Sequence, residues 1–418
     1  MKMNLCRTLL PLLACACAFT TSGSAQEWTR FRGPNGTGIS KAKGIPVTWT
    51  EADFIYRVRI PGESHSQPVI WGDKLFVMTA MEGANQRALV CLDKKTGKEL
   101  WTKTYTQDPK KGGNKNSGSA NTSAVVDAKH VVALFVSADQ FWVRAFDHSG
   151  KELWSHNLGT WEAQHGHGAS PMIYENMVIV PDEQTGESFV VAYDLATGKE
   201  VWKTTRSPHA TGTGYATPIV NIRKDGKPEL IVASQAHGVS GLDPKTGKTY
   251  WESPTTYNKR IVSSPVLAGD IVIATCGSAT VGSVYLAALK LGGHGDVSET
   301  HLAYTIKAGT PYVPTPLIAG DTMYTVNDSG IACAIEASTG KEIWTERVKA
   351  EFFASPVWVD NKIYIPSTKG EMLVLATGNK FELLARNPIL EGTHSTPCID
   401  NNRMYIKTFT HLICLGGK

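Results

Sequence analysis

The sequence has little net charge of either sign, no C-x-x-C motif and no two adjacent cysteines. Its 418 residues include 42 Lys and Arg against 38 Asp and Glu, a formal net charge of +4. Setting aside Lys2 and Arg7 near the N-terminus leaves 40 basic residues against 38 acidic ones. A nucleic-acid-binding protein normally carries a basic excess, so nucleic acid is not indicated as a partner.

Several familiar catalytic and cofactor motifs are also missing. The chain has no G-x-S-x-G nucleophile elbow, no P-loop, no H-E-x-x-H and no C-x-x-C-H haem site. No third ligand is spaced to complete a metal site with His165 and His167, so no metal is predicted. No catalytic residue is predicted either.

The cysteines do not form a disulfide framework. Three of the eight, Cys6, Cys15 and Cys17, lie near the N-terminus. The other five are Cys91, Cys276, Cys333, Cys398 and Cys414. An odd number without C-x-x-C spacing argues against complete pairing in an exported chain. We expect these five to be small buried hydrophobic residues.

Residues 1–25 have the pattern of a secretory signal peptide. Lys2 and Arg7 flank the start, an apolar run covers Leu9–Phe19, and small residues precede Gln26. The run is too short for a membrane span. We expect cleavage after Ala25 and a periplasmic or secreted protein; a lipoprotein anchored through Cys15 is the less favoured alternative.

The rest of the chain is built on a ten-residue phrase, first seen as Leu-Asp-Lys-Lys-Thr-Gly-Lys-Glu-Leu-Trp. It occurs at Leu92–Trp101, Tyr193–Trp202, Leu242–Trp251 and Ile335–Trp344, with a shorter copy at Phe146–Trp154. Such self-similarity indicates a repeat architecture. The phrase is the end of one strand, a tight turn and the start of the next.

Two positions of the phrase have structural roles. Glycine at the turn can adopt the positive φ of a tight hairpin; these residues are Gly97, Gly150, Gly198, Gly247 and Gly340. The tryptophan that follows is predicted to dock between neighbouring repeats and to need a partner for its ring N–H. These residues are Trp101, Trp154, Trp202, Trp251 and Trp344.

A second phrase, a Ser- or Thr-containing entry followed by Pro and an apolar strand, marks the start of seven of the eight repeats, and Ala124 takes the Pro position in the second. Seven intervals separate Pro68 from Pro397 and average about 47 residues, as in propeller blades. Each repeat reads as four short antiparallel strands, and eight repeats fit the chain. The sequence therefore predicts an all-β, eight-bladed propeller over residues 51–418, preceded by an irregular lead-in at 26–50.

The ends of the chain are predicted to meet. The last repeat, Thr396–Leu415, has only three strands, while Asp53–Ile60 alternates like a strand outside any complete repeat. We expect this N-terminal strand to close the ring as the outer strand of the last blade. The Gly-rich stretch Trp28–Ser40 is expected against the outside of the ring.

Candidate binding residues lie just before the strand-opening prolines. In a propeller blade, the chain leading into the first strand and the loop between strands two and three share the face around the channel mouth. His65 and His394, from the first and last blades, are expected to approach each other there. The candidate ligand-binding set at the mouth is His65, Asn121, His165, His167, Tyr215, His237 and His394.

The Asp-x-x-Thr-Gly-Lys-x-x-Trp phrase and the Ser-Pro-Val strand starts resemble the pyrroloquinoline quinone (PQQ)-type propeller repeat over about residues 50–415. Arg30–Pro34, His165–Pro171 and the ending Leu412–Leu415 resemble exported bacterial proteins called BamB-like. The resemblance implies two functions. One is a non-catalytic scaffold, without a cofactor, that binds an envelope protein, peptide or glycan, and we expect it as a monomer.

The alternative is a PQQ- and Ca²⁺-dependent dehydrogenase oxidising an alcohol or sugar. Enzymes of that class commonly have an adjacent Cys-Cys pair and a converging Glu, Asn and Asp calcium site. This chain has no adjacent cysteines, and the calcium set does not map onto it residue by residue. The scaffold is therefore the preferred hypothesis.

Overall fold

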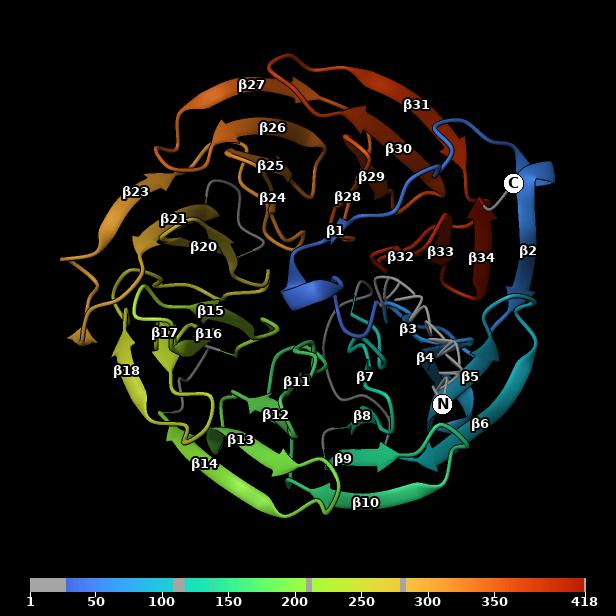
Figure 1. Cartoon of the computed structure of the whole chain (residues 1–418), viewed down its shortest axis with the longest axis horizontal. Helices are drawn as coiled ribbons and strands as arrows, with labels where there is room; N and C mark the ends of the chain where they lie inside the picture. Colours follow the sequence, from blue (N-terminus) through green and yellow to red (C-terminus); the bar gives the residue numbers. More distant parts are fainter. Residues whose placement is uncertain (1–27, 108–116, 138, 208–212, 279–282, 417–418) are drawn as a thin grey trace, which may run out of the picture.

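The computed structural model describes residues 28–107, 117–137, 139–207, 213–278 and 283–416. Eight antiparallel four-stranded sheets surround a central axis as an eight-bladed β-propeller (Figure 1). The predicted signal peptide, with Cys15 and Ala25, lies outside the described residues. Within the described ranges, no helix is long and apolar enough to cross a membrane.

The first four blades, from the innermost strand outward, are β3 (Val69–Trp71), β4 (Lys74–Met81), β5 (Gln86–Asp93), β6 (Glu99–Thr106); β7 (Val125–Val126), β8 (Val131–Val136), β9 (Phe141–Phe146), β10 (Glu152–Asn157); β11 (Met172–Tyr174), β12 (Met177–Asp182), β13 (Ser188–Asp194), β14 (Glu200–Arg206); and β15 (Ile219–Ile222), β16 (Pro228–Ser234), β17 (Gly238–Leu242), β18 (Thr249–Glu252).

The other four blades are β19 (Val266–Ala268), β20 (Ile271–Cys276), β21 (Tyr285–Lys290), β23 (Leu302–Ile306); β24 (Leu317–Ala319), β25 (Thr322–Val326), β26 (Ile331–Glu336), β27 (Glu342–Arg347); β28 (Val357–Val359), β29 (Lys362–Pro366), β30 (Glu371–Ala376), β31 (Leu383–Pro388); and β32 (Cys398–Asp400), β33 (Arg403–Lys407), β34 (His411–Gly416), β2 (Phe54–Arg59). Three 3₁₀ turns complete the inventory: η1 (Pro34–Gly36), η2 (Glu51–Asp53) and η3 (Glu82–Ala84).

The N-terminal strand closes the ring. β2 pairs antiparallel with β34, with Arg57 opposite Ile413, and so supplies the fourth strand of blade 8. The predicted closure is confirmed. An ion pair between Lys94 Nζ in the turn of blade 1 and Asp400 Oδ2 in blade 8, 2.6 Å apart, links the two blades at the same junction.

The hydrophobic core lies between adjacent blades. The second and third strands of each blade are buried almost throughout, because both of their faces pack against neighbouring sheets. Between blades 1 and 2, for example, Val69 and Phe76 lie in one cluster with Phe135 and Phe146. The five described cysteines are free and buried, as expected.

Aromatic residues join the blades at the outer side of the ring. Each donates a ring N–H or hydroxyl hydrogen to a main-chain oxygen in the turn of the next blade. The pairs are Tyr56–Lys94, Trp101–His148, Trp154–Leu195, Trp202–Pro244, Tyr304–Ala337 and Trp344–Gly378, with distances from 2.6 to 3.1 Å. Six of the eight junctions therefore share one contact.

Trp251 does not make this contact. Its ring Nε1 donates to Glu229 Oε1 within its own blade at 2.7 Å. The reason is the irregular connection between the third and fourth strands of blade 5, where β22 (Gly295–Asp296) replaces the usual turn and pairs in parallel with β18. For Trp251 the expected docking between blades is thus replaced by a contact within one blade.

The turn glycines lie against these aromatic rings, which leads to a first test. Gly198 has φ +72°, and a Cβ built on it would lie 2.7 Å from Cγ of Trp154. Gly198→Ala is expected to lower the free energy of unfolding by about 2–4 kcal/mol, because both φ strain and a ring clash oppose it. Urea denaturation measures the loss.

Gly226 provides the matched control. Its φ is +79°, and a Cβ there would meet nothing within 4 Å. Gly226→Ala therefore carries only the backbone strain, expected at about 1 kcal/mol. Equal losses in the two variants would show that the aromatic ring does not restrict the size of the turn residue.

Hydroxyl groups join the blades at the inner side of the ring. We call the Pro that begins the innermost strand of a blade, or Ala124 in blade 2, its strand-opening position. The backbone N–H of the residue directly before it donates to a Ser or Thr hydroxyl of the next blade. The bonds run Gln67–Ser123, Ser123–Ser170, Ser170–Thr217, Thr217–Ser264, Ser264–Thr315, Thr315–Ser355 and Ser355–Thr396, each 2.9–3.0 Å. We call the seven acceptors the hydroxyl belt; it explains why the repeat requires Ser or Thr there.

The lead-in lies across the axis, so the expectation that it packs outside the ring was wrong. η1 sits at the centre of the ring (Figure 1), and β1 (Ile39–Ser40) pairs in parallel with the innermost strand β28. Arg32 Nη1 donates to the carbonyl oxygen of Pro316 at 2.9 Å, and Arg30 Nη2 donates to that of Pro218. We call residues 28–40 the plug. Its arginines fit the centre because carbonyl oxygens of several inner strands converge there.

Candidate functional site

A cavity of about 640 Å³ lies on the channel axis. Every blade contributes to its wall the residue three positions before the strand-opening position. These residues are His65, Asn121, Gly168, Tyr215, Val262, Val313, Phe353 and His394. Of the candidate set, His65, Asn121, His165, Tyr215 and His394 line this cavity, and ligand binding by them stays a prediction. Six members of the hydroxyl belt, all but Ser123, also line the cavity, and so does Phe31 of the plug.

Aromatic rings form the wall at blades 7, 8 and 1. The ring centroids of His65 and His394 are 4.3 Å apart, which confirms the predicted approach across the closure. Phe353 packs edge-on against His394 at 4.6 Å, and Phe409 does so at 5.1 Å. This side of the mouth therefore offers flat, largely apolar surface to a ligand.

His165 lies on another wall and is bridged to blade 5. Arg260, just before β19, places Nη1 3.2 Å from Nε2 of His165 and donates to the hydroxyl oxygen of Tyr312 at 3.2 Å. It also donates to the side-chain oxygen of Gln164. Because a guanidinium only donates, Nε2 of His165 accepts this bond and carries no proton. The contact joins two loops far apart in sequence along the mouth.

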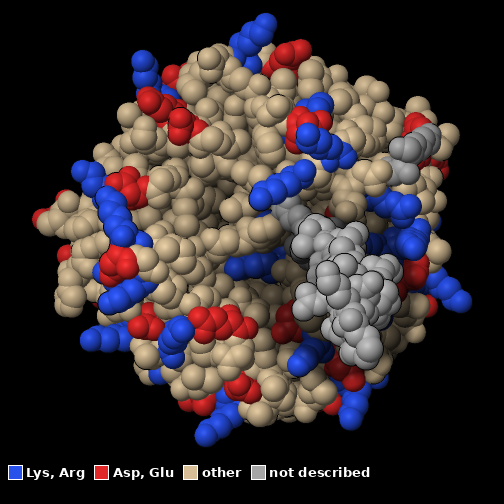
Figure 2. All heavy atoms as spheres, viewed as in Figure 1, with Lys and Arg blue, Asp and Glu red and all other residues tan. Residues whose placement is uncertain are grey.

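The charged residues of the described lining are Lys307 and Asp328. Asp328 Oδ2 accepts a hydrogen bond from the backbone N–H of Tyr312 at 2.8 Å, and burial raises the pKa of its carboxyl. Figure 2 shows acidic and basic side chains alternating around the circumference of one face of the ring, without a large region of one sign.

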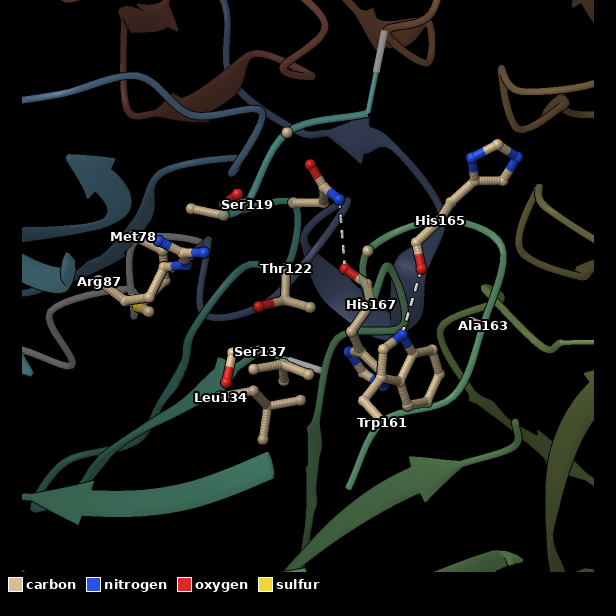
Figure 3. Close-up of a pocket in the computed structure, with 15 residues that line it drawn as sticks. Met78, Arg87, Ser119, Thr122, Leu134, Ser137, Trp161, Ala163, His165 and His167 are labelled. Atoms are coloured by element: carbon tan, nitrogen blue, oxygen red, sulfur yellow. Dashed lines mark hydrogen bonds between the residues drawn. The ribbon is translucent and has the colours of Figure 1, made fainter. Parts of the chain in front are cut away.

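His167 lies behind the cavity wall. It is 4% exposed, its Nε2 is 3.3 Å from the Pro181 carbonyl oxygen, and its ring packs against Trp161 and Phe141. Burial lowers its pKa to about 4. Figure 3 shows it beside Trp161, with the side chain of His165 directed away. His167 lines a small pocket of about 40 Å³ that shares Asn121, His165 and Gly166 with the axial cavity. Its ring contacts with Trp161 and Phe141 hold the His167 side chain on this side of the loop.

His237 does not reach the cavity either. Its Nδ1 donates to Glu252 Oε2 at 2.7 Å, and its Nε2 accepts the backbone N–H of Ser207 at 2.9 Å. Glu252 belongs to the outer strand β18, so the imidazole points outward from the loop between the second and third strands. That loop lies on the expected face, but the side chain is directed away from the axis.

The carboxyl group of Asp182, at the end of β12, is buried and receives one side-chain hydrogen bond. This arrangement gives a second test. Gln184 Nε2 donates to its Oδ1 at 2.9 Å, and Oδ2 has no partner in the described structure. Burial raises its pKa to about 8. The folded state therefore holds a proton that the unfolded state releases near pH 4, so stability falls as pH rises from about 4 to 8.

Asp182→Asn should remove that loss. The amide stays neutral at every pH, so the variant is expected to exceed the parent protein by about 1–3 kcal/mol at pH 8 and to match it near pH 4. Urea denaturation at both pH values measures the difference. Asp321→Asn, at an exposed position, is the control. Parallel stability curves for Asp182→Asn and the parent would contradict the buried-acid interpretation.

Sequence reasoning did not assign a role to several residues that build the site. Lys307 and Tyr312 lie in the connection to blade 6, and Phe31 lies in the plug. The signal for the plug was two arginines around an aromatic residue in a Gly-rich segment. The signal for the hydroxyl belt is the Ser or Thr directly before seven of the eight strand-opening residues, which by itself indicates only the start of a strand.

The donor set does not suit a metal ion. Among the described residues, no group of three or more His, Cys, Asp or Glu side chains is placed to hold one. In the cavity, the carboxylate of Asp328 is already engaged by backbone N–H groups of Tyr312 and Val313. A calcium-bound quinone would need several converging oxygen ligands, so the residues present do not fit that group.

Comparison with known proteins places this geometry in a family. The family model described as outer membrane protein assembly factor BamB matches residues 34–182, 133–291 and 286–408. The BamB of Burkholderia pseudomallei is 23% identical over 390 residues, covering 88% of this chain and 87% of the relative.

Two dehydrogenases are also similar. A polyvinylalcohol dehydrogenase from Pseudomonas sp. is 25% identical over 54% of this chain and 36% of its own length. The quinohemoprotein alcohol dehydrogenase of Comamonas testosteroni superposes with a TM-score of 0.64 at 13% identity, covering 94% of this chain and 81% of that one. The similarity to the quinohemoprotein alcohol dehydrogenase is a similarity of fold. Because the family model spans nearly all of the propeller, the chain belongs to the family described as outer membrane protein assembly factor BamB.

Proposed function

We propose that this protein is an exported, non-catalytic binding module of the bacterial cell envelope, acting through the mouth of its axial cavity. The observation that supports it best is the cavity itself, to which all eight blades contribute one residue at the same repeat position. Such a pocket, apolar on one side and polar on the other, is typical of a recognition site. The partner is an envelope protein, peptide or glycan, and family membership favours a protein.

Capture of partners from envelope extract tests the proposal. The double variant His65→Ala/His394→Ala removes the paired imidazoles at the mouth. His294→Ala, at an exposed position outside the cavity lining, is the matched control. We expect the double variant to lose cross-linked partners that the parent protein and His294→Ala retain. Identical partner sets for all three proteins would contradict binding at the mouth.

The second candidate is a PQQ-dependent dehydrogenase acting on an alcohol or sugar, favoured by the two dehydrogenase relatives. Adding the quinone with Ca²⁺ to the purified protein decides between the candidates. Retained quinone absorbance together with alcohol-dependent dye reduction would establish the dehydrogenase. Neither signal is expected, because no group of three or more His, Cys, Asp or Glu side chains converges among the described residues.

A further inference from the structure

The described cavity lining is rich in hydrogen-bond donors. Six belt hydroxyls line it: Ser170, Thr217, Ser264, Thr315, Ser355 and Thr396. Each oxygen already accepts a backbone N–H from the preceding blade. A hydroxyl that accepts in this way still has its own hydrogen to donate. The belt therefore presents a ring of O–H donors towards the axis.

Tyr215 adds a further hydroxyl to the lining. It is 8% exposed, lines the cavity, and its hydroxyl lies beside the Thr213 side chain and the His165 backbone. A tyrosine hydroxyl can donate its hydrogen as well as accept one. It therefore adds one more potential donor of the same kind as the belt.

Two buried cations lie directly beneath the floor. Arg30 and Arg32 are 6% and 0% exposed, and neither has an ion pair with a described carboxylate; their bonds go to neutral main-chain oxygens and a sulfur. Phe31, between them in sequence, lines the cavity. Burial lowers their pKa values to about 10 and 9, so both remain charged at neutral pH.

The charges do not balance at the cavity. The described lining holds one cation, Lys307, and one acid, Asp328, and the two buried plug arginines add positive charge beneath it. The carbonyl oxygens that receive the arginines belong to Pro218, Pro316 and Pro356, each directly after a belt residue that lines the cavity. The positive charge is thus one residue away from the hydroxyl donors. Fixed positive charge beside a pocket favours the binding of an anion.

We propose that the axial cavity binds a carboxylate-bearing ligand, with the carboxylate on the hydroxyl belt above Arg30 and Arg32 and the ligand body against Phe353, His65 and His394. This deepens, and rests on, the proposed binding function. The direct donors are neutral hydroxyls, which suits a singly charged carboxylate. Two sources carry this group on a body that fits about 640 Å³: an acidic sugar and a peptide C-terminus.

Two matched pairs of probes test the proposal by isothermal titration calorimetry. One is digalacturonate against its dimethyl ester; the other is Ala-Ala-Phe with a free C-terminus against Ala-Ala-Phe amide. We expect at least one acid to bind about tenfold more tightly than its neutral partner, and the preference to weaken with added salt. A preference in the sugar pair alone, or the peptide pair alone, identifies the source.

Three variants test which residues produce the preference for the acid probe. Lys307→Met removes the exposed cation of the wall and is expected to reduce the acid preference about three- to tenfold. Lys199→Met, in the turn of blade 3 outside the cavity lining, should leave it unchanged. Thr315→Val removes one belt hydroxyl at nearly constant shape and should also weaken the acid, provided that thermal denaturation shows a folded protein.

The outcomes separate this inference from the proposed function. Equal affinity for acid and neutral partners, or acid binding that Lys307→Met leaves unchanged, overturns the carboxylate site even if the mouth variants lose their envelope partners. Conversely, an acid preference that depends on Lys307 supports the site even if partner capture does not change.

Discussion

Arg32→Met is expected to lower the free energy of unfolding by about 3–5 kcal/mol, one of the largest effects of any single substitution in this protein. The guanidinium is fully buried and donates to the carbonyl oxygens of Pro316, Pro356 and Thr37. Methionine fills similar space but leaves these oxygens without a donor, and each costs about 1–3 kcal/mol when buried. Urea denaturation monitored by tryptophan fluorescence measures the change.

Arg59→Met is the matched control. Arg59 lies on β2 and is exposed, so the same substitution there is expected to change stability by less than about 0.5 kcal/mol. A small loss for Arg32→Met, comparable with that of Arg59→Met, would mean that the plug does not stabilise the ring. A large loss would mean that the plug is an integral part of the propeller.

The ring could be predicted from the sequence because it is repeated. Gly198 and Trp154 have equivalents in other blades. At most junctions an aromatic ring of one blade packs against the turn glycine of the next, so the same residue types recur. Closure by β2 was predictable for a related reason: a three-stranded last repeat leaves an open edge that only an unassigned strand can cover.

The plug could not be predicted in the same way. Arg30 and Arg32 occur once, and their partners are main-chain oxygens of Pro218, Pro316 and Pro356, which any residue would supply. No side-chain pattern in the sequence marks such acceptors. An arginine in a Gly-rich segment suggests a solvated side chain, and only the convergence of inner strands shows why it is buried.

The candidate site was predictable in position but only partly in orientation. Counting three residues back from each strand start located His65, Tyr215 and His394 at the cavity. The same reasoning failed to direct the side chains of His167 and His237, because loop residues lack the regular alternation of a strand. Contacts with Trp161 and Glu252 decide where these two rings point.

The two inner features of the ring together explain how one end of a propeller channel becomes a binding pocket. The hydroxyl belt holds the blades together with its acceptor oxygens and leaves its hydrogens towards the axis. The plug closes the floor and adds positive charge beneath it. The features that stabilise the ring are therefore also those that give the cavity its chemistry.

Lys407→Met is expected to stabilise the protein at neutral pH. Lys407, in β33 of blade 8, is 0% exposed, and its Nζ donates to the carbonyl oxygens of Thr408 and Phe409. Burial lowers its pKa to about 7, opposed by the charges of Glu391 and Glu63. An unfolded lysine titrates near 10.5, so between about pH 7 and 10.5 the unfolded state binds more protons and stability rises with pH.

The substitution should remove both the cost of the buried charge and this pH dependence. Methionine has a similar length and no charge, and it gives up the two bonds to carbonyl oxygens, so the net gain at pH 7 is expected at about 1–3 kcal/mol. The decisive measurement is the difference in unfolding free energy between Lys407→Met and the parent at pH 7 and pH 10. A gain that shrinks as pH rises supports the buried-charge interpretation, whereas a variant less stable at pH 7 would show that the bonds to Thr408 and Phe409 outweigh desolvation. Lys369→Met, at an exposed position, should follow the parent at both pH values.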